Sequence, residues 1–192
     1  MSNLFIIAGC NGAGKTTASY TILPAMLNCK EFVNADEIAK GLSPFQPETV
    51  SFQAGRIMLQ RIEELLNSGV DFAFETTLTT LSYQKTIQHA KEKGYTVTLL
   101  FFWLNDVNLA IERVAARVAD GGHNIPKDII IRRYWKGIHN LVKVFVNLSD
   151  YWLVINNSSE PYLFIAEGNG KAEMKVYNKQ VWEKLKSTAN EK

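Results

Sequence analysis

Residues 9–16 of the 192-residue chain have the sequence GCNGAGKT, which fits the phosphate-binding pattern GxxxxGK[ST]. They lie between an apolar run that predicts a strand, Leu4–Ala8, and a segment that predicts a helix, Lys15–Thr21. Glycines let successive backbone N–H groups turn toward an anion, and a helix N-terminus adds partial positive charge. We therefore predict a P-loop that binds ATP through Gly9, Cys10, Asn11, Gly12, Ala13, Gly14, Lys15, Thr16 and Thr17.

Two side chains of this loop have the chemistry for catalysis. The ammonium group of Lys15 is expected to reach the β- and γ-phosphates, and the hydroxyl of Thr16 is expected to bind the Mg²⁺ that bridges them. The alternative is a glycine-rich turn with a solvated lysine, and the strand–loop–helix context argues against it. A P-loop indicates nucleotide binding and leaves the fate of the phosphate to other residues.

Acidic side chains follow two further segments that predict strands. Asp36 comes after Glu31–Asn34, at the carboxyl edge of the expected sheet, where it can accept the proton of an attacking hydroxyl. Its alternative role is to cap a helix that begins at Glu37. Glu75 closes the segment that starts at residue 71. It is expected to bind an acceptor hydroxyl or the Mg²⁺ shell, and its alternative is an ordinary turn residue.

Four of the six arginines lie within residues 113–133. Arg113 and Arg117 are four residues apart and share one helix face, whereas the adjacent Arg132 and Arg133 must point apart. Glycines 121 and 122 separate the two pairs, so we predict a lid over about residues 113–133 that brings guanidinium groups to the transferring phosphoryl. His123, in the same loop, is a candidate contact for phosphate or substrate, and its alternative is a polar residue packed in the loop. The alternative for the whole segment is a salt-bridged surface hairpin.

The elements that position these residues alternate along the chain. Further strands are expected over 96–104 and 151–156, and further helices from residue 47 to a stop at Gly69 and over 82–93, 108–118, 126–146 and 179–186. Segments 162–167 and 173–177 predict an antiparallel hairpin. We therefore expect a single α/β domain over residues 1–192. It is a three-layer α/β/α sandwich of the P-loop kinase type, with a mainly parallel five-stranded sheet and a C-terminal hairpin.

Composition argues against several classes of protein. Lys and Arg exceed Asp and Glu by only 21 − 19 = +2, so no nucleic-acid partner is expected from bulk charge. The longest apolar run, residues 97–104, is far shorter than the roughly 18–20 residues of a membrane span, so no membrane partner is expected either. The N-terminus lacks the basic region of a signal peptide, which predicts a cytoplasmic protein. The two cysteines form no zinc-ligand pattern.

Together these features resemble the zeta-toxin-like family of P-loop kinases, including a branch often labelled predicted ABC-type ATPases. The likeness extends from Gly9 through the lid, with its GGHNIP and IIRRY segments, into the strand that begins at Tyr151. The chain has no LSGGQ-type signature, which argues against an ABC transporter ATPase.

The resemblance implies roles for particular residues. Lys15 and the lid arginines hold the ATP phosphates, Asp36 acts as the base, and Glu75 with Thr77 holds a nucleotide sugar such as UDP-N-acetylglucosamine. One position departs from the family pattern, because Thr79 stands where zeta toxins typically have an arginine.

The expected function is a Mg²⁺- and ATP-dependent kinase that transfers the γ-phosphoryl group to a hydroxyl of a small molecule. The resemblance adds toxin activity and an antitoxin protein as partner. Two alternatives remain: an ATPase in which Asp36 or Glu75 polarises water, and a nucleotide-gated switch that acts on a protein partner.

Overall fold

The computed structural model describes residues 2–190 and shows a seven-stranded sheet with the order β2-β3-β1-β4-β5-β6-β7. Strands β1 to β5 are parallel, and β6 and β7 are antiparallel to their neighbours. The strands are β1 (Asn3–Gly9), β2 (Glu31–Val33), β3 (Phe72–Thr76), β4 (Thr96–Trp103), β5 (Tyr151–Asn156), β6 (Leu163–Asn169) and β7 (Ala172–Val176).

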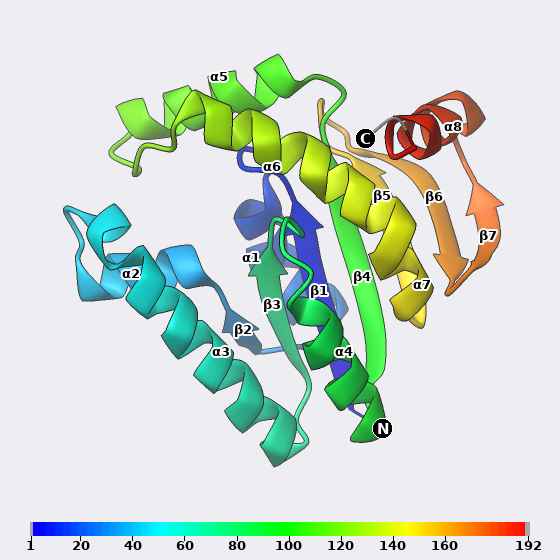
Figure 1. The fold of residues 1–192 in the computed structure, drawn as a ribbon, viewed down its shortest axis with the longest axis horizontal. Coiled ribbons are helices and arrows are strands. Elements are labelled where there is room, and N and C mark those ends of the chain that lie inside the picture. The colour runs from blue at the N-terminus through cyan, green and yellow to red at the C-terminus, as the bar shows by residue number, and fades with distance from the viewer. Residues whose placement is uncertain (1, 191–192) are drawn as a thin grey trace.

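Helices cover both faces of this sheet. Figure 1 shows α4 and α6 in front of the strands and α1 behind them. The helices are α1 (Lys15–Met26), α2 (Ala35–Leu42), α3 (Ser51–Ser68), α4 (Tyr83–Glu92), α5 (Val107–Ala119), α6 (Lys127–Asn140), α7 (Val146–Leu148) and α8 (Lys179–Thr188), with a 3₁₀ turn η1 (Pro47–Val50) and a π-helical turn η2 (Leu141–Phe145). The expected three-layer α/β/α sandwich is confirmed.

The central strands explain why the core is continuous. Six of the seven residues of β1 are buried, and so are the last five residues of β4. A parallel strand covered by helices on both faces needs apolar side chains on both sides, which accounts for the unbroken runs LFIIA and LLFFW. The carboxyl ends of β1, β2 and β3 meet at one edge of the sheet, where the glycine-rich loop, α2 and the segment after Thr76 begin.

The strand count differs from the expected five because the C-terminal hairpin joins the sheet. Strand β6 pairs with β5, for example Val154 opposite Ala166, and β7 pairs with β6. The ring of Trp152 lies over Gly168, and a Cβ atom at Gly168 would collide with this ring. Trp152 also stacks on Trp182 of α8, with ring centroids 5.3 Å apart. Local alternation predicts a hairpin but does not identify the strand that it pairs with.

Helix boundaries also differ at particular positions. Helix α1 extends past Thr21 to Met26 and includes Pro24. The helix expected over 126–146 begins at Lys127 and, beyond Asn140, continues through the π-helical turn η2. Within residues 2–190, no helix is both long and apolar enough to cross a bilayer.

Candidate functional site

The loop between β1 and α1 has a backbone path that requires glycine. Gly12 and Gly14 have φ values of 77° and 79°, in the left-handed region that a residue with a Cβ atom adopts only at a cost. A Cβ atom at Gly12 would lie 2.7 Å from the carbonyl oxygen of Ala110, and one at Gly14 would lie 2.5 Å from Nδ2 of Asn157. The Asn157 amide donates to the carbonyl of Ala13 at 2.8 Å, so the loop after β5 fixes the glycine-rich loop from outside.

A pocket of about 820 Å³ lies over this loop and contains many of the predicted site residues. Helix α1 contributes the ammonium and hydroxyl groups, α2 contributes carboxylates, and α5 with the loop after it contributes basic groups. The lining residues are Asn11, Gly12, Gly14, Lys15, Thr16, Thr17, Tyr20, Thr21, Asp36, Glu37, Lys40, Glu75, Arg113, Arg117 and His123. The structure therefore brings together residues more than 100 positions apart in the sequence.

At the floor of this pocket the two side chains of the P-loop converge on Glu75. Lys15 Nζ donates to the carbonyl of Cys10 at 2.9 Å and lies 3.4 Å from Glu75 Oε1. Thr16 Oγ1 donates to Glu75 Oε2 at 2.7 Å. Asn34 Nδ2 also donates to Glu75 Oε2, at 2.9 Å. Both carboxylate oxygens of Glu75 thus face hydrogen-bond donors, one of them the buried ammonium of Lys15.

Asp36 lies in the first turn of α2 and does not cap it. The helix begins at Ala35, and Asn34 is the capping residue, because its Oδ1 accepts from the backbone N–H of Asp36 at 2.8 Å. The Asp36 carboxylate lines the pocket and lies near Arg133. Burial lowers the pKa of the Arg133 guanidinium, and the negative charge of Asp36 opposes that shift.

The four arginines of the 113–133 segment have four different environments. Arg113 donates to the carbonyls of Asn157 and Ser158 at 2.8 and 3.1 Å, so it holds the loop after β5. Arg117 lines the pocket, and its guanidinium lies 3.5 Å from the carbonyl oxygen of His123.

Adjacent arginines on α6 point to opposite sides. Arg133 donates to Oδ1 of Asn11 in the glycine-rich loop at 3.1 Å. Arg132 instead lines a separate hollow of about 490 Å³ with Trp135 and His139. The structure thus brings Arg133, and not Arg132, to the phosphate-binding loop.

Thr77 lies beyond the pocket lining, in the segment that follows β3. Its hydroxyl forms a hydrogen bond with the hydroxyl of Thr79 at 3.0 Å. Leu78 between them is fully buried with φ of 55°, and its carbonyl accepts from the buried amide of Asn140 at 2.6 Å. A bulky residue with positive φ is held by its surroundings, so α6 fixes the shape of this segment.

Sequence reasoning missed Asn34 and Tyr20 as site residues. Tyr20 is exposed on α1 and lines the pocket, five residues after the lysine of the P-loop. Asn34 directly precedes α2, and an asparagine before an acidic helical turn is an N-cap signal. That signal explains its backbone contact and does not reveal its bond to Glu75.

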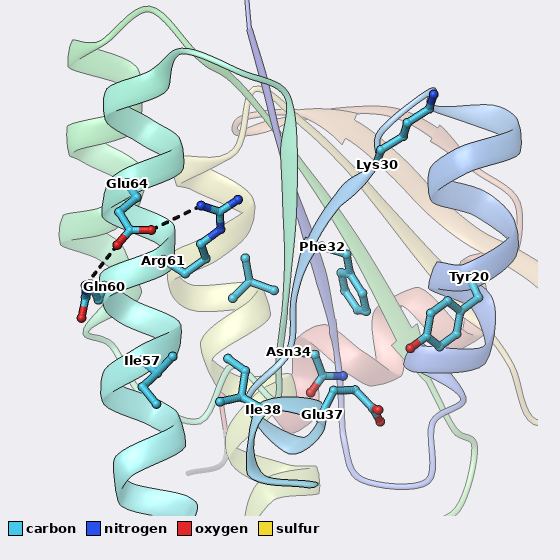
Figure 2. Close-up of a pocket in the computed structure, with 11 residues that line it drawn as sticks. Tyr20, Lys30, Phe32, Asn34, Glu37, Ile38, Ile57, Gln60, Arg61 and Glu64 are labelled. Atoms are coloured by element: carbon cyan, nitrogen blue, oxygen red, sulfur yellow. Dashed lines mark hydrogen bonds and ion pairs between the residues drawn. The ribbon is translucent and has the colours of Figure 1, made fainter. Parts of the chain in front are cut away.

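A second hollow of about 580 Å³ borders the first. Figure 2 shows β2 running between Tyr20 of α1 and the side chains of α3, with Phe32 directed toward Tyr20. The rings of Tyr20 and Phe32 pack edge to face at 6.2 Å, and Arg61 pairs with Glu64 at 3.3 Å. The lining of this second hollow does not include the P-loop residues Lys15 and Thr16, which line the first pocket, so the first pocket carries the chemistry.

The donor set at the floor of the first pocket fits Mg²⁺. This ion prefers hard oxygen ligands and keeps several waters, so one or two protein oxygens beside substrate phosphates are sufficient. The Thr16 hydroxyl gives its hydrogen to Glu75 and keeps its lone pairs for a cation, and the Glu75 carboxylate stands behind it. Among residues 2–190, no group of three or more His, Cys, Asp or Glu side chains is placed to hold a metal ion.

Comparison with known proteins identifies the fold and the family. A curated protein of Haemophilus influenzae is 32% identical over 126 residues, which cover 66% of this chain and 88% of that protein. The crystal structure of AvrRxo1-ORF1:-ORF2 with ATP contains a chain that matches with a TM-score of 0.75 and 19% identity, over 98% of this chain and 64% of that chain. The present chain thus spans less than two thirds of that larger one.

A structure of the PezAT chromosomal toxin-antitoxin system of Streptococcus pneumoniae matches with a TM-score of 0.64 and 16% identity, over 100% of this chain and 87% of that chain. At these identities the structural matches establish the fold. The model of the family described as Zeta toxin matches residues 2–167, from β1 into β6. The chain therefore belongs to the zeta toxin family of P-loop kinase-like proteins.

Proposed function

We propose that the protein is an ATP-dependent phosphotransferase that moves the γ-phosphoryl group of ATP to a hydroxyl of a small molecule. The observation that carries the proposal is the convergence of Lys15, Thr16, Glu75 and Asp36 on one pocket of about 820 Å³. Phosphoryl transfer depends mainly on positioning and charge stabilisation, and this pocket offers a cation, a Mg²⁺-binding hydroxyl and a carboxylate base within one cavity.

The P-loop holds the nucleotide in this proposal. Lys15 leaves Glu75 and the carbonyl of Cys10 and moves its ammonium to the β- and γ-phosphates. Thr16 holds Mg²⁺, with Glu75 accepting its hydroxyl hydrogen. When bound, Mg²⁺ neutralises negative charge on the phosphate oxygens. Residues 156–158, at the carboxyl end of β5, accept hydrogen bonds from Arg113 and border the nucleotide base.

Asp36 acts as the base. Its backbone N–H is held by the Asn34 side chain, and its carboxylate faces the pocket near the positive charge of Arg133. In this position it accepts the proton of the attacking hydroxyl as the oxygen–phosphorus bond forms.

Basic groups of the α5–α6 segment stabilise the transferring phosphoryl. We assign this role to Arg117, which lines the pocket, and to Arg133, which contacts the P-loop residue Asn11. His123 lines the same pocket and is a further phosphate contact. The segment 113–133 is proposed to close as a lid over the nucleotide, since α5 and α6 are joined by a loop that contains the adjacent glycines 121 and 122.

The acceptor is proposed to be a nucleotide sugar, with UDP-N-acetylglucosamine as the first compound to test. Glu75 and Thr77 are the candidate acceptor residues, and the presence of Thr79 instead of arginine makes related nucleotides the next to test. Membership of the zeta toxin family and similarity to the AvrRxo1-ORF1:-ORF2 and PezAT structures support an antitoxin-like protein as partner.

The proposal is tested by incubating the protein with MgATP and a panel of hydroxylated metabolites, with ADP and phosphorylated product measured together. A kinase forms ADP in a one-to-one ratio with phosphorylated acceptor. An ATPase forms ADP without acceptor, and a nucleotide-gated switch binds MgATP without turnover. When arginines of the 113–133 segment are substituted, Arg132→Ala serves as the matched control, because this arginine lines a different hollow.

A further inference from the structure

Asn34 occupies the junction between β2 and α2, beneath the proposed reaction centre. Only 6% of the residue is exposed, although its side chain is an amide. A buried amide is costly unless its donors and acceptor are satisfied, and each end of this one has a partner on a different element.

The nitrogen of the amide faces the metal-binding side of the pocket. Asn34 Nδ2 donates to Glu75 Oε2 at 2.9 Å and lies 3.5 Å from Thr16 Oγ1. Glu75 Oε2 is the same oxygen that accepts the Thr16 hydroxyl hydrogen. The amide therefore holds the carboxylate in the orientation in which it accepts the Thr16 hydroxyl hydrogen.

The oxygen of the amide faces the base. Asn34 Oδ1 accepts from the backbone N–H of Asp36 at 2.8 Å and caps α2. One planar group thus fixes the start of the helix that bears Asp36 and the carboxylate behind Thr16. An aspartate or serine would cap the helix equally well, but neither offers an amide donor to Glu75.

We propose that Asn34 is a positioning residue of the phosphoryl-transfer site, an inference that rests on the proposed function. Its amide sets the distance between the Mg²⁺-binding Thr16–Glu75 pair and the Asp36 base. It acts through these groups without contacting the nucleotide. Positioning partners of metal ligands typically contribute about 10- to 100-fold to metal affinity or activity.

Substitutions can separate the two ends of the amide. Asn34→Ser and Asn34→Asp retain an N-cap oxygen and lose the donor to Glu75, whereas Asn34→Ala loses both. The matched control is Asn178→Ser, because Asn178 also caps a helix, α8, by accepting from the N–H of Val181, far from the pocket in the sequence.

The measurement is nucleotide affinity by calorimetry, with and without Mg²⁺, beside turnover. We expect Asn34→Ser and Asn34→Asp to weaken MgATP binding or lower kcat by about 10- to 100-fold. Affinity for ATP in excess chelator should stay within a few-fold. Asn178→Ser should match the parent in every measurement. If Asn34→Ser and Asn34→Asp match the parent and only Asn34→Ala changes, Asn34 is a helix cap and the inference is overturned.

A second measurement needs no nucleotide. Asn34→Asp places a second carboxylate against Glu75, so the two negative charges repel and the Tm should fall. Adding Glu75→Gln gives an amide that can donate to the carboxylate of residue 34. The double variant should therefore regain the Tm that Asn34→Asp loses. No regain would contradict the amide–carboxylate contact. Failure of every acceptor to be phosphorylated would overturn the proposed function alone, because metal-dependent nucleotide affinity would still report on Asn34. A parent protein that binds no MgATP would overturn both.

Discussion

Lys15 and Glu75 form a buried ion pair at the floor of the pocket, with Nζ 3.4 Å from Oε1 and side chains 6% and 10% exposed. The lysine that should bind phosphate is therefore paired with a carboxylate in this structure. The same carboxylate accepts hydrogen bonds from Thr16 and Asn34, so it remains oriented when the ammonium moves away.

The first prediction concerns this pair. Lys15→Met should lower turnover by about 100- to 1,000-fold, because it removes a charge directed at the developing phosphoryl charge. It should also destabilise the nucleotide-free protein by up to about 3 kcal/mol, since Glu75 loses its buried counter-charge. Denaturant unfolding and turnover measure the two effects.

The double variant Lys15→Met with Glu75→Gln is the control for that prediction. It should regain much of the lost stability without regaining turnover, because the buried charge is gone but the phosphate ligand is still missing. Equal turnover in Lys15→Met and the parent would contradict the P-loop assignment. Equal stability in Lys15→Met and the parent would mean that the ion pair contributes nothing to folding.

The sequence predicts the central part of this fold well, and the reason is physical. Buried parallel strands such as β1 and β4 have unbroken apolar runs, and the glycine spacing of residues 9–16 specifies a loop around an anion. Pairing across the sheet has no such local signal. The hairpin 163–176 is predictable as a hairpin, but its pairing with β5 depends on Gly168 admitting Trp152, which only the assembled structure reveals.

The shared location of several candidate site residues was predictable to the same extent. Residue types at strand ends identify Lys15, Asp36 and Glu75, because the carboxyl edge of a parallel sheet gathers them. Asn34 was missed because its partner Glu75 is 41 residues away and an asparagine at a helix start already has an ordinary explanation as a cap. Adjacent arginines must diverge, but the phase of α6 decides that Arg133 is the one that contacts the P-loop.

The second prediction compares these adjacent arginines. Arg133→Ala should lower turnover by about 100-fold or more, because it removes a guanidinium held beside the phosphate loop by Asn11. Arg132→Ala should stay within a few-fold of the parent, since its side chain lies in a separate hollow. Steady-state kinetics on both variants provide the comparison. The reverse ranking would show that α6 presents its other face to the nucleotide in the closed state.

The third prediction uses the buried thiol of Cys10. Burial raises the pKa of this thiol to about 11, although Lys15 and Arg113 nearby oppose the shift. In the unfolded chain it titrates near its ordinary value of 9.0, so between pH 9 and 11 the unfolded state releases a proton that the folded state keeps. The free energy of unfolding should therefore fall as pH rises through this window.

Cys10→Ala tests the cause of that fall. Urea unfolding at several pH values should show a shallower decline in the variant than in the parent, because one titrating group has been removed. In addition, the thiol of the folded parent should react slowly with iodoacetamide at pH 8, where it is protonated. Rapid alkylation at that pH without unfolding would contradict the burial of Cys10.

The last prediction separates a kinase from a nucleotide-gated switch and depends on Asp36. Asp36→Asn keeps the shape of the side chain and removes its basicity, so nucleotide affinity should hold while phosphoryl transfer falls by about 100- to 10,000-fold. The helix cap is Asn34, so the cost to α2 is limited to the loss of a negative charge near its N-terminus, about 0.3–1 kcal/mol. Calorimetry with MgATP beside turnover measures both. Undiminished turnover in the variant would remove Asp36 from the mechanism and make Glu75, another carboxylate of the pocket, the candidate base.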